Sequence, residues 1–547
     1  MMTDAPHDTP GVASGASQPS AAGASCANAG AIARPSLLRY APALILLVIT
    51  VADAGRYADT DLWGHIYFGN AAMHASHFID HDPYNYSVPG HYWMAHEWLS
   101  EAIMARVYDA GGVIGLKLWR YSVTAVAILA LSFAVAESGA AVPIQFVVLI
   151  ASAFALIPVM QFRPQIFSYA LLAILIAMLA RDNYRGRAPL WAAIPMLALW
   201  SNLHGGFFIG LVTLGIYAAT NAAVDLAGGR GLGRGLRLGA IAAASAIATL
   251  VNPRAFGTWQ AVIDSLRNPM TRSVVADWRP LMAVVAGAHG LHSGIIFLVT
   301  VLVLIAAFAL SVMLAPRGGD LALVAIGAVM SVAAFTAVRN IPLAVIATAT
   351  PLAHHLSLAI GRWRGGRETT AAQAQAATDA RMTGLGQSVI VLTVVILLLG
   401  KGGLFASTLP AATDYPVGAV DFMRAHQLHG NILNDFEWGQ YLIWHLAPES
   451  KVFIDGRFDL VYTPAVVRDY LAFFFGKPSG ARILDAYPND FVLVPPKSAA
   501  YQTMIARAGW KLIYRDANAA LFAPDKSAAA AIAGIPVMGI APKSNFP

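Results

Sequence analysis

Acidic and histidine side chains concentrate in one stretch that follows the first apolar segment of the sequence. Asp59 and Asp61 stand two positions apart, His65 follows, and the stretch closes with His96 and Glu97. Two carboxylates at this spacing can hold a divalent cation such as Mg²⁺ or Mn²⁺, or accept a proton from an attacking hydroxyl group. Histidines beside them can serve as ligands, bases or hydrogen-bonding groups. The pattern indicates a reaction site, with an ordinary solvated loop as the competing interpretation.

Five junctions between apolar segments carry further polar side chains. They are 162–165, 202–206, 252–254, 277–280 and 339–340, and they contain Arg163, His204, Arg254, Asp277 and Arg339. Charged groups at membrane depth are costly and tend to mark functional sites, although a single arginine can simply snorkel to the surface. His204 likewise can do no more than satisfy carbonyl groups of a helix hairpin. Junctions that share one face predict a pocket with acids on one wall and arginines on another, which suits a phosphate-bearing ligand.

The amino-acid composition indicates whether the segments that carry these groups lie in water or in lipid. Of the 547 residues, 57% are hydrophobic and 12% are charged, whereas soluble domains average about 25% charged residues. Lipid is therefore the main solvent. The net charge of +6 marks cytoplasmic loops in such a protein, so no nucleic-acid partner is predicted. The single cysteine, Cys26, excludes an intrachain disulfide and a cysteine metal cluster.

Apolar stretches long enough to cross a bilayer, or nearly so, recur along the chain. They are 36–54, 112–136, 142–160, 165–181, 188–203, 205–225, 236–251, 291–314, 320–338, 341–360 and 386–405. Since about 20 residues cover the hydrocarbon core, we predict an α-helical polytopic membrane protein with about eleven transmembrane helices within 36–405. The first span has no small-residue cleavage site after it. Residues 1–35, rich in Ala, Ser, Gly and Pro, are predicted to be a disordered tail.

Arginines orient this chain in the membrane. Loops 181–187, 225–237, 315–320 and 361–385 together hold eleven of them. A cytoplasmic N-terminus with eleven spans puts all four loops in the cytoplasm, as the positive-inside rule requires. The stretch 252–290 is the exception, because it carries four arginines on the opposite side. In this threading the loop 56–111, the five polar junctions and the C-terminal region share the extracytoplasmic face.

The C-terminal region has a different pattern from the rest of the chain. Residues 406–525 alternate short β-like runs with helix-like stretches, which predicts a small extracytoplasmic α/β domain. The Ala- and Pro-rich residues 526–547 are predicted to be a loose tail. Two motifs at strand ends, 434–439 and 455–457, combine acids, an amide and an aromatic ring that can bind sugar hydroxyls. Capping of turns and helices is the simpler alternative for both motifs.

This layout resembles the GT-C superfamily of integral-membrane glycosyltransferases, through Asp59-Thr60-Asp61 and His96-Glu97-Trp98. Members have many spans, an acidic motif in the first large external loop and often an external C-terminal domain. They take a sugar from a polyprenyl-phosphate-type lipid. The chain is also similar, more closely in its motifs, to a group of bacterial polytopic membrane proteins of unassigned activity. The shared motifs are 59–63, 96–99, 163–165, 202–206, 434–439 and 453–457. This second likeness implies a location in the bacterial cytoplasmic membrane.

The GT-C resemblance implies roles for the residues singled out above. Asp59 or Asp61 would be the base that deprotonates the acceptor hydroxyl, and Glu97 would assist or hold a metal. The arginines would grip the lipid phosphate and stabilise the leaving group. The substrate-binding set would be His65, His96, Arg163, His204, Arg254 and Arg339. A divalent metal, Mg²⁺ or Mn²⁺, would sit at Asp59 and Asp61 if the reaction uses one. The partners would be a lipid-linked sugar donor, a glycan, lipid or protein acceptor, and membrane lipids.

Two other classes of function stay open at this point. A transporter or flippase for a lipid-linked or small anionic substrate predicts inverted repeats and ionisable residues near the membrane midplane. The sequence has no convincing repeat, and its polar groups stand at the ends of spans. A non-catalytic partner in cell-envelope polysaccharide assembly, with the C-terminal region as a docking domain, is the second alternative. Motifs of soluble enzymes such as a P-loop, GxSxG or HExxH are absent from the sequence.

Overall fold

The computed structural model describes most of the chain. The described residues are 58–75, 80–156, 159–268, 275–283, 292–315, 319–363, 409–410, 415–532 and 545–547. The predicted N-terminal tail, the first predicted span at 36–54 and the last at 386–405 lie outside these residues. Residues 533–544 of the predicted C-terminal tail also lie outside them.

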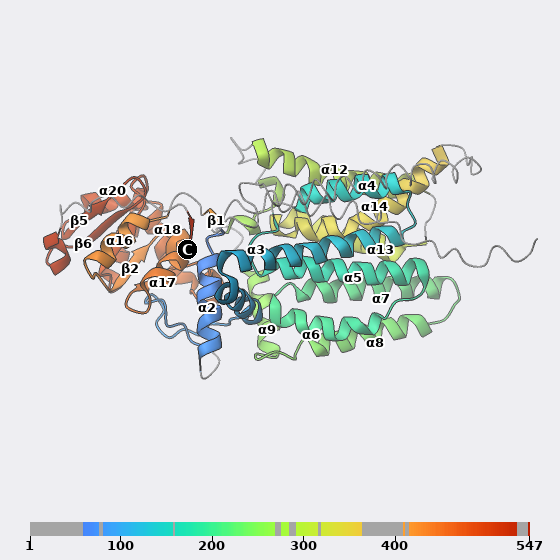
Figure 1. The fold of residues 1–547 in the computed structure, drawn as a ribbon, viewed down its shortest axis with the longest axis horizontal. Helices are drawn as coiled ribbons and strands as arrows, with labels where there is room; N and C mark the ends of the chain where they lie inside the picture. The colour runs from blue at the N-terminus through green and yellow to red at the C-terminus, as the bar shows by residue number, and fades with distance from the viewer. Residues whose placement is uncertain are drawn as a thin grey trace, which may run out of the picture.

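A bundle of long apolar helices and a sheet domain at one end of it make up the described structure (Figure 1). The bundle helices are α3 (Trp98–Glu137), α4 (Val142–Leu156), α5 (Gln165–Arg185), α6 (Ala193–Leu203), α7 (Phe207–Ala227), α8 (Gly233–Ala248), α12 (His292–Leu314), α13 (Leu321–Thr336) and α14 (Ile341–Trp363). Each predicted apolar segment between 112 and 360 corresponds to one of these helices. Apolar composition over such lengths therefore located the helices correctly.

Four helices of the described residues are long and apolar enough to cross a membrane. They are Trp98–Glu137, Gln165–Arg185, Phe207–Ala227 and Val338–Trp363. Shorter apolar helices are Val142–Leu156, Leu190–Leu203, Leu298–Leu314, which is the part of α12 counted here, and Leu321–Thr336. At about 1.5 Å per residue, a helix such as α4 with 15 residues falls short of the ~30 Å hydrocarbon core. The mostly helical fold is confirmed, whereas the predicted number of eleven spans is not.

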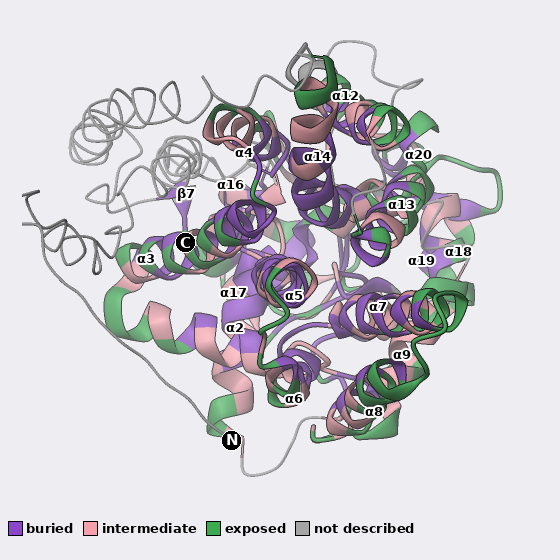
Figure 2. Cartoon of the chain, turned by 90° about the vertical axis from the view of Figure 1, so that its right-hand side faces the viewer, coloured by how far each residue is buried: buried purple, intermediate pink, exposed green. Residues whose placement is uncertain are grey.

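Helix α5 lies at the centre of the bundle when it is viewed end-on (Figure 2). Buried alanines recur along it at Ala170, Ala173, Ala177 and Ala180. This spacing of three and four residues forms a stripe of small side chains, which lets a neighbouring helix approach closely. The N-terminus of α5 lies at the end of the bundle that faces the sheet domain, and Arg163, two positions before the helix, lines the site there.

Polar side chains at the opposite end of the bundle are paired with one another. Tyr217 and Arg234 both hydrogen-bond the carboxylate of Asp182. Asp320, 1% exposed, accepts a hydrogen bond from Tyr184 and lies 3.0 Å from His355. Networks of this kind join the helices at that end of the bundle.

Helix α2 (Leu62–His74) crosses the end of the bundle between α3 and the sheet domain (Figure 1). The sequence predicts a helix here that lies in the membrane interface with Trp63 among its aromatic side chains. The helix is present, but Trp63 is 1% exposed and packs edge-on against Tyr415 and Tyr441. Protein therefore covers this aromatic face. The following helix, α3, turns sharply at Gly112, where φ is +55°, a value that glycine adopts readily.

The sheet domain confirms the predicted small α/β fold. Its five-stranded sheet has the order β3–β2–β4–β6–β5. The strands are β2 (Asn431–Asn434), β3 (Lys451–Val452), β4 (Phe491–Val494), β5 (Trp510–Arg515) and β6 (Ala520–Pro524), with β2 parallel to β3 and β4 and the others antiparallel. The main helices are α16 (Val417–Ala425), α17 (Gly439–Leu446), α18 (Pro464–Phe474) and α20 (Ala499–Ala506). Thr463 and Ser498 cap α18 and α20 through their hydroxyl groups, as expected for N-cap residues.

A short second sheet brings the chain end back to the bundle. Strand β1 (Leu409–Pro410) pairs antiparallel with β7 (Asn545–Phe546). Phe546 is fully buried, with its ring 5.3 Å from that of Trp63 and 5.7 Å from that of Tyr108. Within the predicted tail, Ala528–Ile532 also form a 3-10 helix.

Candidate active site

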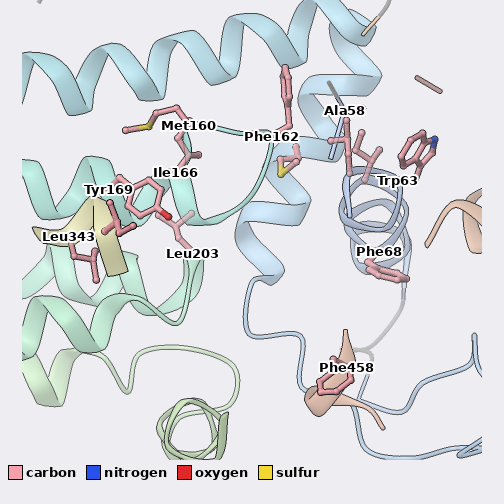
Figure 3. Close-up of a cluster of buried hydrophobic side chains, with 14 of the residues drawn as sticks. Ala58, Trp63, Phe68, Met160, Phe162, Ile166, Tyr169, Leu203, Leu343 and Phe458 are labelled. Carbon is pink, nitrogen blue, oxygen red and sulfur yellow. The ribbon is translucent and has the colours of Figure 1, made fainter. Parts of the chain in front are cut away.

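A cavity of about 560 Å³ lies where the bundle, the first loop and the sheet domain meet. Figure 3 shows Phe68 and Phe458, from the loop and the sheet domain, on one side of this region and Tyr169 and Leu343, from the bundle, on the other. The site residues predicted from sequence that line the cavity are Asp59, Asp61, His65, His96, Glu97, Arg163, His204 and Arg339. The structure thus brings together segments that are almost 300 positions apart in the chain.

Arg254 is the predicted site residue that does not line the cavity. Its guanidinium lies over the ring of Tyr92, 5.4 Å from the centroid, and 4.0 Å from the carboxylate of Asp80. Asn252 accepts a hydrogen bond from the backbone N–H of Arg254, and this turn points the arginine toward the outer part of the loop. Arg254 therefore does not face the ligand that the cavity would hold.

Helix ends place the reactive groups of the cavity. Asp61 and Glu97 are the N-cap residues of α2 and α3, where the positive end of the helix dipole favours a carboxylate. Arg163 precedes Pro164, the N-cap residue of α5, and a residue before proline is disfavoured in helical geometry. His204 ends α6 in extended conformation, with φ of −166°. Each side chain therefore leaves its helix at the same end of the bundle.

Arg163 is the central cation of the acidic wall. Its Nε lies 2.7 Å from Asp59 Oδ1, its Nη2 3.1 Å from Asp61 Oδ2, and its Nη1 3.2 Å from Asp277 Oδ2. Burial alone would lower the pKa of Arg163, but the three carboxylates outweigh it and raise the pKa. Three carboxylates around one guanidinium leave this wall with an excess of negative charge.

Asp59 and Asp61 differ in their surroundings. Asp59 Oδ1 accepts the backbone N–H of Asp61, 3.0 Å away, in addition to its ion pair with Arg163. Burial raises the pKa of Asp61 to about 6; Arg163 opposes this shift, and the negative charge of Asp59 adds to it. A carboxylate with this pKa is well matched to accept a proton near neutral pH, whereas Asp59 is engaged in shaping the loop.

The proton on His204 is placed by its hydrogen bonds. Its Nδ1 accepts from the hydroxyl of Ser168 and from the backbone N–H of Gly206, so the ring proton lies on Nε2, which is 3.3 Å from Glu97 Oε1. Trp200 donates to the Ser168 oxygen and completes the chain. Burial lowers the pKa of His204 to about 3, which keeps the ring neutral. His204 therefore orients the carboxylate of Glu97.

His65, Glu97 and Glu101 form the group of described residues that could hold a metal ion, with ligand atoms within 4.8 Å of one another. Burial alone would lower the pKa of His65, but its hydrogen bond to Glu101 and the charges of Glu101 and Glu97 raise it to about 9. A proton on His65 holds the group together where a metal would otherwise bind. Imidazole with two carboxylates suits Mn²⁺ or Zn²⁺ better than Mg²⁺. Asp59 and Asp61 fit a metal less well, because Arg163 contacts both.

Arg339 is the cation of the cavity that has no carboxylate partner among the described residues. Its guanidinium lies over Trp278, 4.3 Å from the ring centroid. A guanidinium held by an aromatic face keeps its N–H groups directed to other acceptors. Of the three arginines predicted to bind phosphate, Arg339 is therefore the one whose donors are available.

Comparison with known proteins gives a result at the level of fold. No family model and no curated protein matches the sequence. The oligosaccharyltransferase of Archaeoglobus fulgidus, tethered to an acceptor peptide, is similar with a TM-score of 0.52 and 11% identity, over 84% of this chain and 68% of that one. The arabinofuranosyltransferase AftD from Mycobacteria has a TM-score of 0.51 and 14% identity, over 89% of this chain and 40% of that one.

The chain shares its fold with this oligosaccharyltransferase and this arabinofuranosyltransferase. Identities of 11% and 14% show a common fold and carry no residue roles. The chain also spans only 40% of the arabinofuranosyltransferase.

Three groups of the cavity were not assigned from the GT-C resemblance. Glu101 stands four positions after Glu97, and this i, i+4 spacing on one helix face was the signal for it. Asp277 was visible as part of a polar junction. From the sheet domain, Gly456 belongs to the motif 455–457 considered above for sugar binding, whereas Gln440 had no local signal, because only the tertiary structure brings that domain to the cavity.

Proposed function

We propose that the protein is a membrane glycosyltransferase that moves a sugar from a polyprenyl-phosphate-type lipid to an extracytoplasmic acceptor. The observation that carries the proposal is that one cavity is lined both by a carboxylate suited to take a proton, Asp61, and by Arg339, an arginine without a carboxylate partner among the described residues. The GT-C fold supports the assignment, because the similar proteins of known structure are named as an oligosaccharyltransferase and an arabinofuranosyltransferase.

The lining of the cavity suits a lipid-linked donor. Apolar side chains from α7, α9 (Phe256–Arg267) and α14 cover the part nearest the bundle. They include Phe208, Ile209, Val262, Leu266 and Leu343. Such a surface accommodates an isoprenoid chain, while Arg339 provides charge-assisted hydrogen bonds to the phosphate. The acidic wall on the other side leaves room for the hydroxyl group of an acceptor.

The proposed reaction needs one base and one anion-stabilising group. Asp61 takes the proton of the acceptor hydroxyl as the acceptor oxygen bonds to the anomeric carbon. The bond between that carbon and the phosphate oxygen breaks, and its electron pair stays on the lipid phosphate, whose charge Arg339 stabilises. Arg163 holds the Asp61 carboxylate in place throughout. If a divalent metal serves the reaction, His65, Glu97 and Glu101 would hold it, and it would supply positive charge near the leaving group.

The threading predicted from the arginine loops completes the proposal. With about eleven spans and a cytoplasmic N-terminus, the cavity and the C-terminal domain face the extracytoplasmic side of a bacterial cytoplasmic membrane. Lipid-linked sugars and glycan, lipid or protein acceptors would meet there. A reporter fused after Gly402 should then be active outside the cytoplasm, and a cytoplasmic signal would contradict this orientation.

The decisive experiment is turnover of a panel of polyprenyl-phosphate sugars by the purified protein in lipid. Wild type should transfer or hydrolyse one donor, and Asp61→Asn should abolish that activity. Asp485→Asn is the matched control, since Asp485 pairs with Arg507 on the surface with its side chain 67% exposed. Absence of turnover for every donor, together with wild-type behaviour of Asp61→Asn in cells, would contradict the proposal. Uptake of substrate into sealed vesicles without bond formation would favour a transporter instead.

A further inference from the structure

The turn Asp455-Gly456-Arg457 of the sheet domain has a role different from the sugar binding considered for it above. Arg457 is buried, and its guanidinium makes a two-pronged contact with Asp82 of the first loop, with Nη1 2.8 Å from Oδ1 and Nη2 3.1 Å from Oδ2. Its Nε and Nη2 also donate to Asp455 at 2.9 and 2.6 Å. Its donors are thus committed to carboxylates on both sides of the contact between loop and domain.

Aromatic side chains of the first loop enclose this arginine. The guanidinium carbon lies 4.6 Å from the ring centroids of Phe68 and Trp93 and 5.5 Å from that of Tyr84. The hydroxyl of Tyr462 donates to Oδ2 of Asp455. Four of its five N–H groups bind carboxylates and its faces pack against aromatic rings, which suits a structural role better than sugar binding. Arg457 therefore joins the sheet domain to the loop.

The loop also extends the sheet itself. The N–H of Val452 in β3 donates to the carbonyl of Tyr84, and the carbonyl of Val452 accepts from Tyr86. The hydroxyls of Ser87 and Tyr86 donate to Phe453 O and Asn489 Oδ1. Main-chain pairing of this kind covers the exposed edge of β3. Loop and domain are thus joined by backbone pairing as well as by the buried ion pairs.

Gly456, next to Arg457 in the chain, brings the backbone of the sheet domain into contact with the reaction site. A methyl group added there would overlap Asp61 Oδ1 and lie 2.9 Å from Gln440 Nε2. One carboxylate oxygen of Asp61 therefore rests against the backbone of the sheet domain, while the other lies 3.1 Å from Arg163. A side chain at position 456 would push the carboxylate out of this place.

We propose that the sheet domain is a fixed wall of the reaction cavity, held by Arg457, and that Gly456 positions the Asp61 carboxylate. The positioning role rests on the proposed function, whereas the fixed attachment does not. Arg457 and Gly456 act through Asp61 and are positioning residues. A displacement of about 1 Å at a reacting group costs on the order of 10²-fold in rate, so a loss of this size is expected when the wall is altered.

A reversible crosslink tests the attachment. A Cβ atom added at Gly64 would lie 2.9 Å from Gln440 Cγ, the position that a cysteine sulfur at residue 440 would occupy. In a disulfide, the sulfur of one cysteine lies roughly 3 Å from the Cβ of the other. Gly64→Cys with Gln440→Cys, in a Cys26→Ser background, should form a disulfide on mild oxidation, seen as a gel shift that reductant reverses. Turnover by the oxidised and reduced protein should be equal. A missing crosslink would overturn the attachment, and activity that returns only on reduction would show that the domain must move.

The positioning role has its own test. Gly456→Ala should lower kcat about 10²-fold and leave the KM for the donor unchanged. Gly418→Ala is the control, because its added methyl would overlap Tyr514 within the same domain, away from the cavity, and kcat should be retained. Wild-type kcat in Gly456→Ala would overturn the positioning role. A Gly456→Ala protein that fails to fold would make Gly456 a residue required for packing and would likewise overturn the positioning role. If wild type turns over no donor, the proposed function fails, while the disulfide still reports on the attachment.

Discussion

Arg163 and Arg457 each bind carboxylates from separate segments of the chain. A comparison of the Arg163 cluster with the Arg457 cluster shows how similar groups can serve a reaction in one place and hold the fold together in the other. Arg457 has two acidic partners and a side chain that is 5% exposed, whereas Arg163 has three and is 23% exposed. Both arginines line the same cavity, but Arg457 packs against the rings of Phe68 and Trp93 and is the more deeply buried of the two. The same residue types therefore lock two parts of the fold together in one place and form a reactive wall in the other.

The pKa values of the two clusters move in opposite directions. Burial would raise the pKa of Asp455, but the charge and hydrogen bonds of Arg457, with the Tyr462 hydroxyl, lower it below its usual value. Burial raises the pKa of Asp61, and a single ion pair with Arg163 does not compensate in the presence of Asp59. A carboxylate that is fully hydrogen-bonded stays ionised and inert, whereas one with incomplete pairing and like charges nearby can exchange a proton.

The largest expected effect in this comparison is on catalysis at the Arg163 cluster. Asp61→Asn should lower kcat by roughly 10²–10⁴-fold, the usual range for removal of a general base, with little change in the melting temperature. Single-turnover transfer from a polyprenyl-phosphate sugar measures it. Asp59→Asn should cost less, because Asp59 shapes the loop. The reverse order would make Asp59 the base.

The next largest effect is on the free energy of unfolding, through the Arg457 cluster. Arg457→Met leaves Asp82 and Asp455 buried without their cation and should cost roughly 3–5 kcal/mol of unfolding free energy. Arg163→Met should cost about 1 kcal/mol or less, because its partners reach the cavity. Denaturant unfolding of the two variants in detergent measures the difference. Equal losses would mean that the clusters do not differ in kind.

A smaller effect is expected on binding of the lipid phosphate. Arg339→Gln should weaken polyprenyl-phosphate affinity roughly 10- to 100-fold, since hydrogen bonds to charged groups contribute about 1.5–3 kcal/mol. Arg163→Gln should change the affinity less than about threefold, because Asp59, Asp61 and Asp277 already use its donors. Titration of the lipid into nanodiscs that carry each variant distinguishes them. A larger loss in Arg163→Gln would return Arg163 to the phosphate-binding role predicted from sequence.

The smallest effect is on the pH profile. Asp61 must be ionised to accept a proton, so with a pKa of about 6 kcat/KM should be on a plateau above that pH and fall about tenfold per unit below it. The positive charge of Arg163 lowers this pKa, so Arg163→Gln should move the acid limb to higher pH. Arg482→Gln on the surface is the control and should leave the profile unchanged. A limb that moves to lower pH in Arg163→Gln would contradict the pairing.

Much of this architecture could be predicted from local patterns. Apolar runs predicted the helices between 112 and 360, and short β-like runs predicted the strands of the sheet domain, because both depend on residues close in sequence. Polar groups at the ends of spans, such as His204 and Arg339, were correctly expected to meet. The sequence does not indicate which partner a side chain takes when several are within its reach. Arg254 turned toward Asp80 and Tyr92, and no local pattern distinguishes that partner from a phosphate.

The amino-acid sequence was enough to predict that lipid surrounds the apolar segments, where the helices and the sheet domain lie, and which residues are candidates for the cavity. Hydrophobic period and residue type carry that information. The tertiary structure alone decided which carboxylate each arginine holds. It surrounded Arg163 with three acids, left Arg339 without a carboxylate partner in the described part of the chain, and set the backbone of Gly456 against Asp61. The physical reason is that charge pairing and close approach depend on distances between segments hundreds of residues apart, and those distances exist only after the bundle, the loop and the domain have packed together.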